Sequence, residues 1–139
     1  MMQLLGMQCG PKYAIDILVV DDQPLNQKII FSMLVKLGCD PNRIFMANDG
    51  HQAIEIFQEF PSDLILMDCH MPILDGFETA REIRILEQKK GQRLVPIIAF
   101  TSDESMATRK LAEAVGMNDY LSKPYRFSAL RDMIKIYAH

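Results

Sequence analysis

The sequence predicts a single α/β domain built on a doubly wound parallel sheet. Three short apolar runs, at residues 15–20, 64–67 and 95–100, are rich in Val, Ile and Leu almost without interruption. Such runs are typical of parallel strands that are covered on both faces. Longer helical patterns alternate with the apolar runs along the chain, so that five strand–helix units follow one another. Right-handed crossovers then place helices on both sides of one sheet.

The elements can be assigned in chain order. We expect strands at residues 15–20, 43–47, 64–67, 95–100 and 119–122, and helices at 25–37, 50–59, 76–89, 104–115 and 126–137. Gly38, Gly91 and Gly116 follow three of the helical patterns, and glycine is common just after a helix. The second helix stops before Pro61 and the third follows Asp75. We expect residues 1–13 to be a flexible lead-in or linker and residues 14–139 to form the domain.

Composition argues against several classes of function. The chain has 139 residues, of which 49% are hydrophobic and 24% charged, as in ordinary globular domains. The net charge of −3 disfavours nucleic acid or an anionic membrane surface as the main partner. Cys9, Cys39 and Cys69 fit neither a disulfide framework nor a zinc pattern, which favours a reducing, cytoplasmic setting. We expect no membrane insertion by this chain, because no segment approaches the length of a membrane span.

Polar side chains gather where the expected strands end. Asp21 and Asp22 follow the first strand, Asp68 the third, Thr101 the fourth and Lys123 the fifth. Because functional groups in such sheets collect at the carboxyl ends of the strands, we expect these five side chains to converge. A carboxylate at the end of an apolar strand is costly to desolvate, so its position there calls for a chemical reason.

Three converging acids predict a cation site. At about 4 Å and an effective dielectric constant of about 20, each close pair of carboxylates repels by roughly 4 kcal/mol. Hard oxygen ligands select Mg²⁺, or a similar ion such as Mn²⁺, together with water and phosphate. Asp21 and Asp22 are adjacent and suit the metal, whereas Asp68 stands alone and suits a nucleophile that forms an acyl phosphate. Thr101 and Lys123 can contact the phosphoryl oxygens.

Four motifs resemble the successive signatures of the receiver domain of two-component response regulators. They are LVVDDQPLNQ, LILMDCHMPILDG, IIAFTS and GMNDYLSKP, and they occur in the family's order between residue 15 and about residue 137. The resemblance implies a flavodoxin-like (βα)5 sandwich with strand order 2-1-3-4-5. The segments NQKIIFSMLVKLG and MDCHMPILDGFE look most like receivers attached to hybrid histidine kinases.

The resemblance implies how the site is built. Asp68 would be the phosphoacceptor, Thr101 and Lys123 would contact the phosphoryl group, and the Lys123–Pro124 peptide bond would be cis. Four residues would bind the metal: Asp21, Asp22, Asp68 and, through its backbone carbonyl, Cys69.

The resemblance also implies residues that control the phosphorylated state. Thr101 and Tyr120 would form the switch, with Tyr120 in the place of the family's aromatic residue. His70 and Asp103 occupy positions that tune the lifetime of the acyl phosphate in this family. Ser102 stands where receivers often have alanine, and its hydroxyl can alter the local hydrogen bonds.

A receiver domain would act as a phosphorylation-switched module of a two-component phosphorelay. The implied donor is a phosphohistidine on a histidine kinase or a histidine phosphotransfer protein, and an output domain or partner would use the face built by residues 104–137. Such a domain is no enzyme in the turnover sense, although it catalyses its own phosphorylation and dephosphorylation. It would work in the cytoplasm, alone or as the cytoplasmic part of a larger membrane-bound kinase.

Two other functions were weighed against this one. A pseudo-receiver would use the fold only to bind partners, but the intact acids, threonine and lysine speak against it. A flavodoxin-like FMN protein would need a phosphate-binding loop rich in Ser, Thr and Gly after the first strand. The segment VDDQPLNQ offers acids there instead, and these would repel the phosphate.

Helical spacing predicts a docking surface on the helix at 25–37. Six of its residues share one face and are expected to pack on the sheet: Asn26, Ile29, Ile30, Met33, Leu34 and Leu37. Phe31 and Val35 point away from that face, with Leu25 nearby, and surplus apolar side chains favour a contact site. In the resembled family, histidine-bearing helical partners dock on this helix. The alternative is that the lead-in or the last helix covers these residues.

Overall fold

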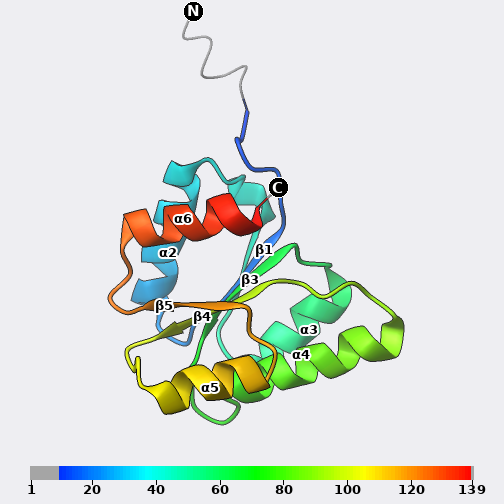
Figure 1. Cartoon of the computed structure of the whole chain (residues 1–139). Helices are drawn as coiled ribbons and strands as arrows, with labels where there is room; N and C mark the ends of the chain where they lie inside the picture. Colours follow the sequence, from blue (N-terminus) through cyan, green and yellow to red (C-terminus); the bar gives the residue numbers. More distant parts are fainter. Residues whose placement is uncertain (1–9, 139) are drawn as a thin grey trace, which may run out of the picture.

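One parallel sheet of five strands forms the centre of the computed structural model, which describes residues 10–138 (Figure 1). The strands are β1 (Ile17–Val20), β2 (Ile44–Ala47), β3 (Leu64–Asp68), β4 (Ile97–Thr101) and β5 (Asp119–Ser122). Their order across the sheet is β2-β1-β3-β4-β5, which confirms the predicted 2-1-3-4-5 arrangement.

A helix follows each strand. The helices are α2 (Pro24–Leu37), α3 (Gly50–Glu59), α4 (Gly76–Lys90), α5 (Met106–Ala114) and α6 (Phe127–Tyr137), with a short 3-10 helix, η1 (Pro41–Arg43), before β2. Helices α2 and α6 cover one face of the sheet, and α3, α4 and α5 cover the other (Figure 1). In the described residues, no helix is long and apolar enough to cross a membrane.

The two faces of the sheet hold two separate apolar cores, because successive side chains of a strand point to opposite faces. Ile17 and Val19 of β1 join the core beneath α2 and α6. Leu18 and Val20 join the core beneath α3, α4 and α5. Burial on both faces explains why the strand sequences are continuous apolar runs instead of alternating ones.

Capping side chains set where the helices begin. Asp75 accepts the backbone N–H of Glu78 at 2.8 Å, and the Glu78 carboxylate accepts that of Asp75 at 3.2 Å. This reciprocal capping box fixes the start of α4. Helix α5 begins at Met106, two residues later than predicted, because the Ser105 hydroxyl caps it by accepting the N–H of Thr108.

The predicted packing of Ile29 against the sheet is wrong. Its side chain is 38% exposed, whereas Ile30 and Leu34 are fully buried as expected. Ile29 lies one helical turn after the exposed Leu25, on the flank of α2, so the face that meets the sheet is narrower than the apolar periodicity suggested.

The predicted lead-in is described only in part, because residues 1–9 lie outside the described residues. Tyr13, its last residue, forms an isolated parallel bridge with Cys39, and its N–H donates to the Gly38 carbonyl at 2.9 Å. The end of this segment therefore packs on the domain. The boundary at residue 13 stays a prediction.

Candidate functional site

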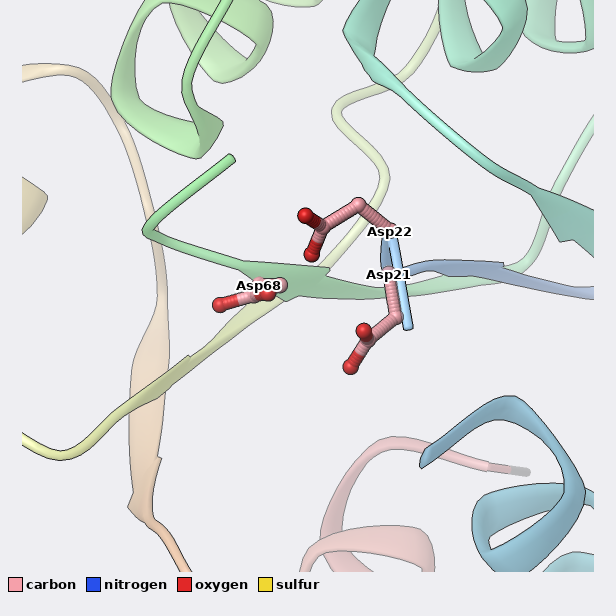
Figure 2. A group of neighbouring side chains, drawn as sticks. All are labelled: Asp21, Asp22 and Asp68. Carbon is pink, nitrogen blue, oxygen red and sulfur yellow. The ribbon is translucent and has the colours of Figure 1, made fainter. Parts of the chain in front are cut away.

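Three acids meet at the carboxyl edge of the sheet, as predicted. Val20 of β1 is in register with Met67 of β3, so that Asp21 and Asp68 follow at the same level. Asp21, Asp22 and Asp68 each offer one carboxylate oxygen, and these atoms lie within 4.8 Å of one another (Figure 2). Asp21 and Asp68 are buried and Asp22 is half-buried. The arrangement brings three carboxyl groups together at one edge of the sheet.

The surroundings of Asp68 shift the pKa of its carboxyl group and occupy one of its two oxygens. Its Oδ1 accepts the Lys123 ammonium at 2.8 Å and the His70 backbone N–H at 3.1 Å. Burial raises the pKa of Asp68 above its usual value, although Lys123 and the His70 N–H act in the opposite direction. Both bonds end on Oδ1. The second oxygen, Oδ2, accepts none of the hydrogen bonds found among residues 10–138, and is free for other ligands.

Asp21 is held at both carboxylate oxygens. Oδ1 accepts the Gln23 backbone N–H at 2.8 Å, and Oδ2 accepts the Tyr125 hydroxyl at 2.7 Å. The Tyr125 ring packs edge-on against Phe100, with 4.6 Å between the ring centroids. Tyr125 was not predicted from the sequence to be part of the site. The available signal was an aromatic residue with a hydroxyl two positions after Lys123, but nothing in the sequence indicated which acid it would reach.

A close backbone approach explains the Asp-Gly pair at the start of α4. A β-carbon at Gly76 would overlap the backbone oxygen of Asp68 and come within 2.8 Å of the Cys69 α-carbon. Glycine therefore lets α4 begin against the end of β3. The Gly76 N–H donates to the Cys69 carbonyl at 3.1 Å. A carbonyl oxygen has two lone pairs, so this bond leaves room for the metal contact predicted for Cys69.

Thr101 and Lys123 reach the same edge from β4 and from the end of β5. Thr101 is buried, its hydroxyl oxygen accepts the Asp103 N–H at 3.0 Å, and the oxygen lies 3.3 Å from His70 Nε2. The backbone N–H of Lys123 donates to the backbone carbonyl of Thr101 at 2.9 Å. The Lys123–Pro124 peptide bond is cis, as the resemblance implied.

The Asp103 carboxylate is held by residues at the start of α5. Its carboxylate accepts the Thr108 hydroxyl at 2.7 Å and the Ser105 N–H at 2.9 Å. These bonds lower the pKa of Asp103 below its usual range, with Thr108 the largest cause. His70, the other predicted lifetime residue, is exposed and next to Thr101.

Tyr120 lies in the layer between the sheet and α5. Its ring packs against the core on that side, and the Arg109 guanidinium sits 4.5 Å from the ring centroid. Thr101, Tyr120, Ala99 and Ala112 line one small hollow that is too small to hold a water molecule. The two predicted switch residues therefore line the same small space.

A comparison with protein families agrees with this arrangement of acids, lysine and threonine. The family model described as response regulator receiver domain matches residues 17–135. The chain belongs to the response regulator receiver domain family.

Relatives of this receiver domain occur within histidine kinases. The histidine-protein kinase BarA of Shigella flexneri is 34% identical over 134 residues, which cover 96% of this chain and 14% of BarA. The first curated relatives are much longer than this chain, which spans between 5% and 14% of their lengths.

Solved structures share the fold. The receiver domain of sensor histidine kinase PA1611 from Pseudomonas aeruginosa was solved with a magnesium ion in its active site cleft. It is 39% identical with a TM-score of 0.77, over 89% of this chain and 97% of that one. A chain in the Saccharomyces cerevisiae complex of the phosphotransfer protein Ypd1 with the Ssk1 receiver domain is 34% identical. Its TM-score is 0.84, over 91% of this chain and 90% of that one.

The predicted docking residues of the receiver domain lie on the outer side of α2. Leu25, Phe31 and Val35 are exposed, together with Ile29, which was not expected among them. Helix α2 begins two residues after Asp22, so its first turn, which carries Leu25, follows the acid cluster directly in the chain. Exposure of four large apolar residues on one helix fits a contact surface.

Proposed function

We propose that this receiver domain accepts a phosphoryl group from a phosphohistidine onto Asp68. The observation that carries the proposal is the Asp68 carboxylate itself, buried among two further acids with Lys123 on one oxygen only. Oδ2 would form the new P–O bond while the P–N bond of the phosphohistidine breaks, and the released imidazole would take a proton from water. The domain would catalyse this step without being a turnover enzyme.

The same residues suit Mg²⁺. Three carboxylate oxygens within 4.8 Å of one another are hard ligands, and the cluster needs a positive charge to offset their repulsion. Asp21, Asp22, Asp68 and the Cys69 carbonyl would hold the ion, which supplies charge neutralisation on the phosphoryl oxygens. The magnesium-bound PA1611 receiver supports this choice. Mn²⁺, the alternative ion, is supported by neither observation.

Two residues would hold the phosphoryl group in place. Lys123 already lies 2.8 Å from Asp68, and its ammonium would pair with one phosphoryl oxygen. The Thr101 hydroxyl would rotate from its present partners to donate to another oxygen. Movement of Thr101 would open the shared hollow to the Tyr120 ring, which Arg109 holds in its present position. Phosphorylation would thus shift the population between two packings of β4, β5 and α5.

The lifetime of the acyl phosphate would depend more on His70 than on Asp103. The His70 ring is exposed beside Thr101, where an attacking water would have to pass. The Asp103 carboxylate is engaged by Thr108 and Ser105 and faces α5.

The partners would use two surfaces. A histidine-bearing helical protein, of the kind seen in the Ypd1–Ssk1 complex, would dock on Leu25, Phe31 and Val35 of α2. An output domain or partner would use residues 104–137, where Met106, Leu111 and Phe127 are exposed. A cytoplasmic location and attachment to a larger kinase are further parts of the proposal.

Phosphotransfer from a protein donor tests the proposed function. A purified histidine phosphotransfer protein, phosphorylated beforehand, is mixed with the domain and Mg²⁺, and phosphate on both proteins is followed over time. The donor should lose its phosphate to the wild-type domain and keep it in the presence of Asp68→Asn. Asp63→Asn, a matched change at the opposite edge of the sheet, should behave as wild type. Equal transfer to Asp68→Asn would overturn the assignment of the acceptor.

A further inference from the structure

The Tyr125 hydroxyl connects two parts of the chain that are 104 residues apart in sequence. It donates to Asp21 Oδ2 at 2.7 Å, while the Gln23 N–H holds Oδ1 at 2.8 Å. With one bond on each oxygen, the plane of the Asp21 carboxylate is fixed. Each oxygen keeps a second lone pair, which can bind a metal.

The segment that carries Tyr125 touches both buried acids. Lys123 pairs with Asp68 and, two residues later, Tyr125 bonds Asp21. The Tyr125 ring is half-buried and fixed by its edge-on contact with Phe100 in the core beneath α2 and α6. The hydroxyl is therefore presented by a side chain that cannot easily turn away.

Tyr125 acts only as a donor in this contact. The Asp21 carboxylate oxygen has no proton to give and can only accept, so the Tyr125 hydroxyl donates. The hydrogen bond between Tyr125 and Asp21 therefore points one way.

We propose that Tyr125 is a positioning residue for the metal site. It orients the Asp21 carboxylate so that Asp21, Asp22 and Asp68 can bind one Mg²⁺ together. The Asp21 side chain then loses little conformational entropy when the ion binds. The proposal rests on the metal site of the proposed function. Partners that orient a metal ligand in this way typically change metal affinity by about 10- to 100-fold when they are removed.

The test measures Mg²⁺ affinity by isothermal titration calorimetry on the full chain. Tyr125→Phe keeps the ring and removes only the hydroxyl. Tyr137→Phe is the matched control, because that hydroxyl also bonds an aspartate, Asp119 at 3.1 Å, at the far end of α6. We expect Mg²⁺ to bind roughly 10-fold more weakly to Tyr125→Phe and with unchanged affinity to Tyr137→Phe.

A second readout separates positioning from simple structural support. With acetyl phosphate as donor, Tyr125→Phe should need more Mg²⁺ for half-maximal labelling but reach the wild-type maximum at saturating Mg²⁺. A purely structural role would instead lower the denaturation midpoint of the metal-free protein and leave the Mg²⁺ affinity unchanged. That result, or tighter Mg²⁺ binding, would overturn the proposal.

Asp21→Ala shows which idea has failed. If Asp21→Ala loses Mg²⁺ binding while Tyr125→Phe keeps it, the metal site stands and the role of Tyr125 is wrong. If Asp21→Ala binds Mg²⁺ as wild type does, the metal site is wrong and the proposal for Tyr125 fails with it. Should Tyr125→Phe fold poorly, Tyr125→Met offers an apolar side chain without the hydroxyl and carries the same expectation.

Discussion

The acids at the two edges of the sheet differ in how their charges are paired. At the amino edge, each of three acids forms an ion pair with an arginine. Asp16 pairs with Arg43 at 2.9 Å and Asp63 with Arg93 at 2.7 Å, and the fully buried Glu87 pairs with Arg84 at 2.7 Å. At the carboxyl edge, within residues 10–138, the three clustered acids have one close cation, Lys123.

The difference between the two edges lies in how the charges are paired and not in burial. Glu87 is as buried as Asp68, but its two oxygens accept Arg84 and the Val95 N–H, so its charge is balanced. Asp68 shares its surroundings with two other acids and a single lysine. An uncompensated cluster is expensive for folding alone, and a bound cation would offset the repulsion between its carboxylates.

Glu87→Ala should have the largest effect on stability, because it removes one of the ion pairs at the amino edge. It leaves Arg84 half-buried without its carboxylate and the Val95 N–H without an acceptor. We expect the free energy of unfolding to fall by about 3–5 kcal/mol, measured by urea denaturation. Glu82→Ala, an exposed glutamate on the same helix, is the control and should cost little. A loss in Glu87→Ala no larger than in the control would mean that the amino edge is not held by this pair.

Asp22→Asn should have opposite effects on stability and on metal binding. Removing one of three clustered charges should leave the metal-free protein unchanged or stabilise it by up to about 1 kcal/mol, while Mg²⁺ affinity falls at least about 10-fold. Asp63→Asn should instead destabilise the protein and leave its Mg²⁺ affinity unchanged. It weakens the contacts of this side chain with Arg93 and the Asp16 N–H but touches none of the proposed metal ligands. Calorimetric titration and urea unfolding give both quantities. The distinction between the edges would be lost if both variants responded alike.

Phe31→Asp separates the chemistry of the carboxyl edge from docking beside it. A charge in the apolar surface of α2 should slow transfer from a phosphorylated histidine protein by roughly 10-fold. Labelling by acetyl phosphate should stay normal, since a small donor needs no docking surface. Gln58→Asp adds one negative charge at an exposed position of α3, on the other face of the sheet, and should have no effect. Equal loss with both donors would indicate misfolding, and no loss with either would exclude this surface.

Asp103 lies near the carboxyl edge, but its charge is stabilised by hydrogen bonds, as the charges at the amino edge are by arginines. Its substitution should have the smallest effect on stability. Because Thr108 and Ser105 lower its pKa in the folded state, its contribution to stability is present above the usual carboxyl pKa. That contribution is lost as the pH falls through the lowered value. Urea midpoints of wild type and Asp103→Asn should therefore differ slightly at neutral pH and converge in acid. A difference that did not change with pH would argue against this origin.

The fold and the centre of the site were predictable because both depend on local patterns. Continuous apolar runs identified the parallel strands, and the geometry of such sheets brings strand ends together. Asp21, Asp22, Asp68, Thr101 and Lys123 could therefore be grouped before any coordinates were known, and the family's signatures supplied the strand order.

The contacts that depend on long-range paths were not predictable. Tyr125 reaches Asp21 only because the segment after β5 lies close to the end of β1, an arrangement that no local pattern describes. Glu87 of α4 accepts both Arg84 and the Val95 N–H just before β4, and the helical pattern gave no sign of the contact with Val95. Ile29 was misplaced because periodicity gives the direction of an apolar face but not how far the sheet extends beneath it.

The location of the phosphoryl group tests most directly whether the uncompensated edge is the reactive one. The domain is incubated with acetyl phosphate with and without Mg²⁺, its intact mass is measured, and the modified residue is identified by tandem mass spectrometry. We predict one phosphoryl group, dependent on Mg²⁺ and carried by Asp68, in wild type and in the buried-acid control Glu87→Gln, and none in Asp68→Asn. A phosphoryl group on another residue, or equal labelling of Asp68→Asn, would contradict the assignment of Asp68 as the acceptor.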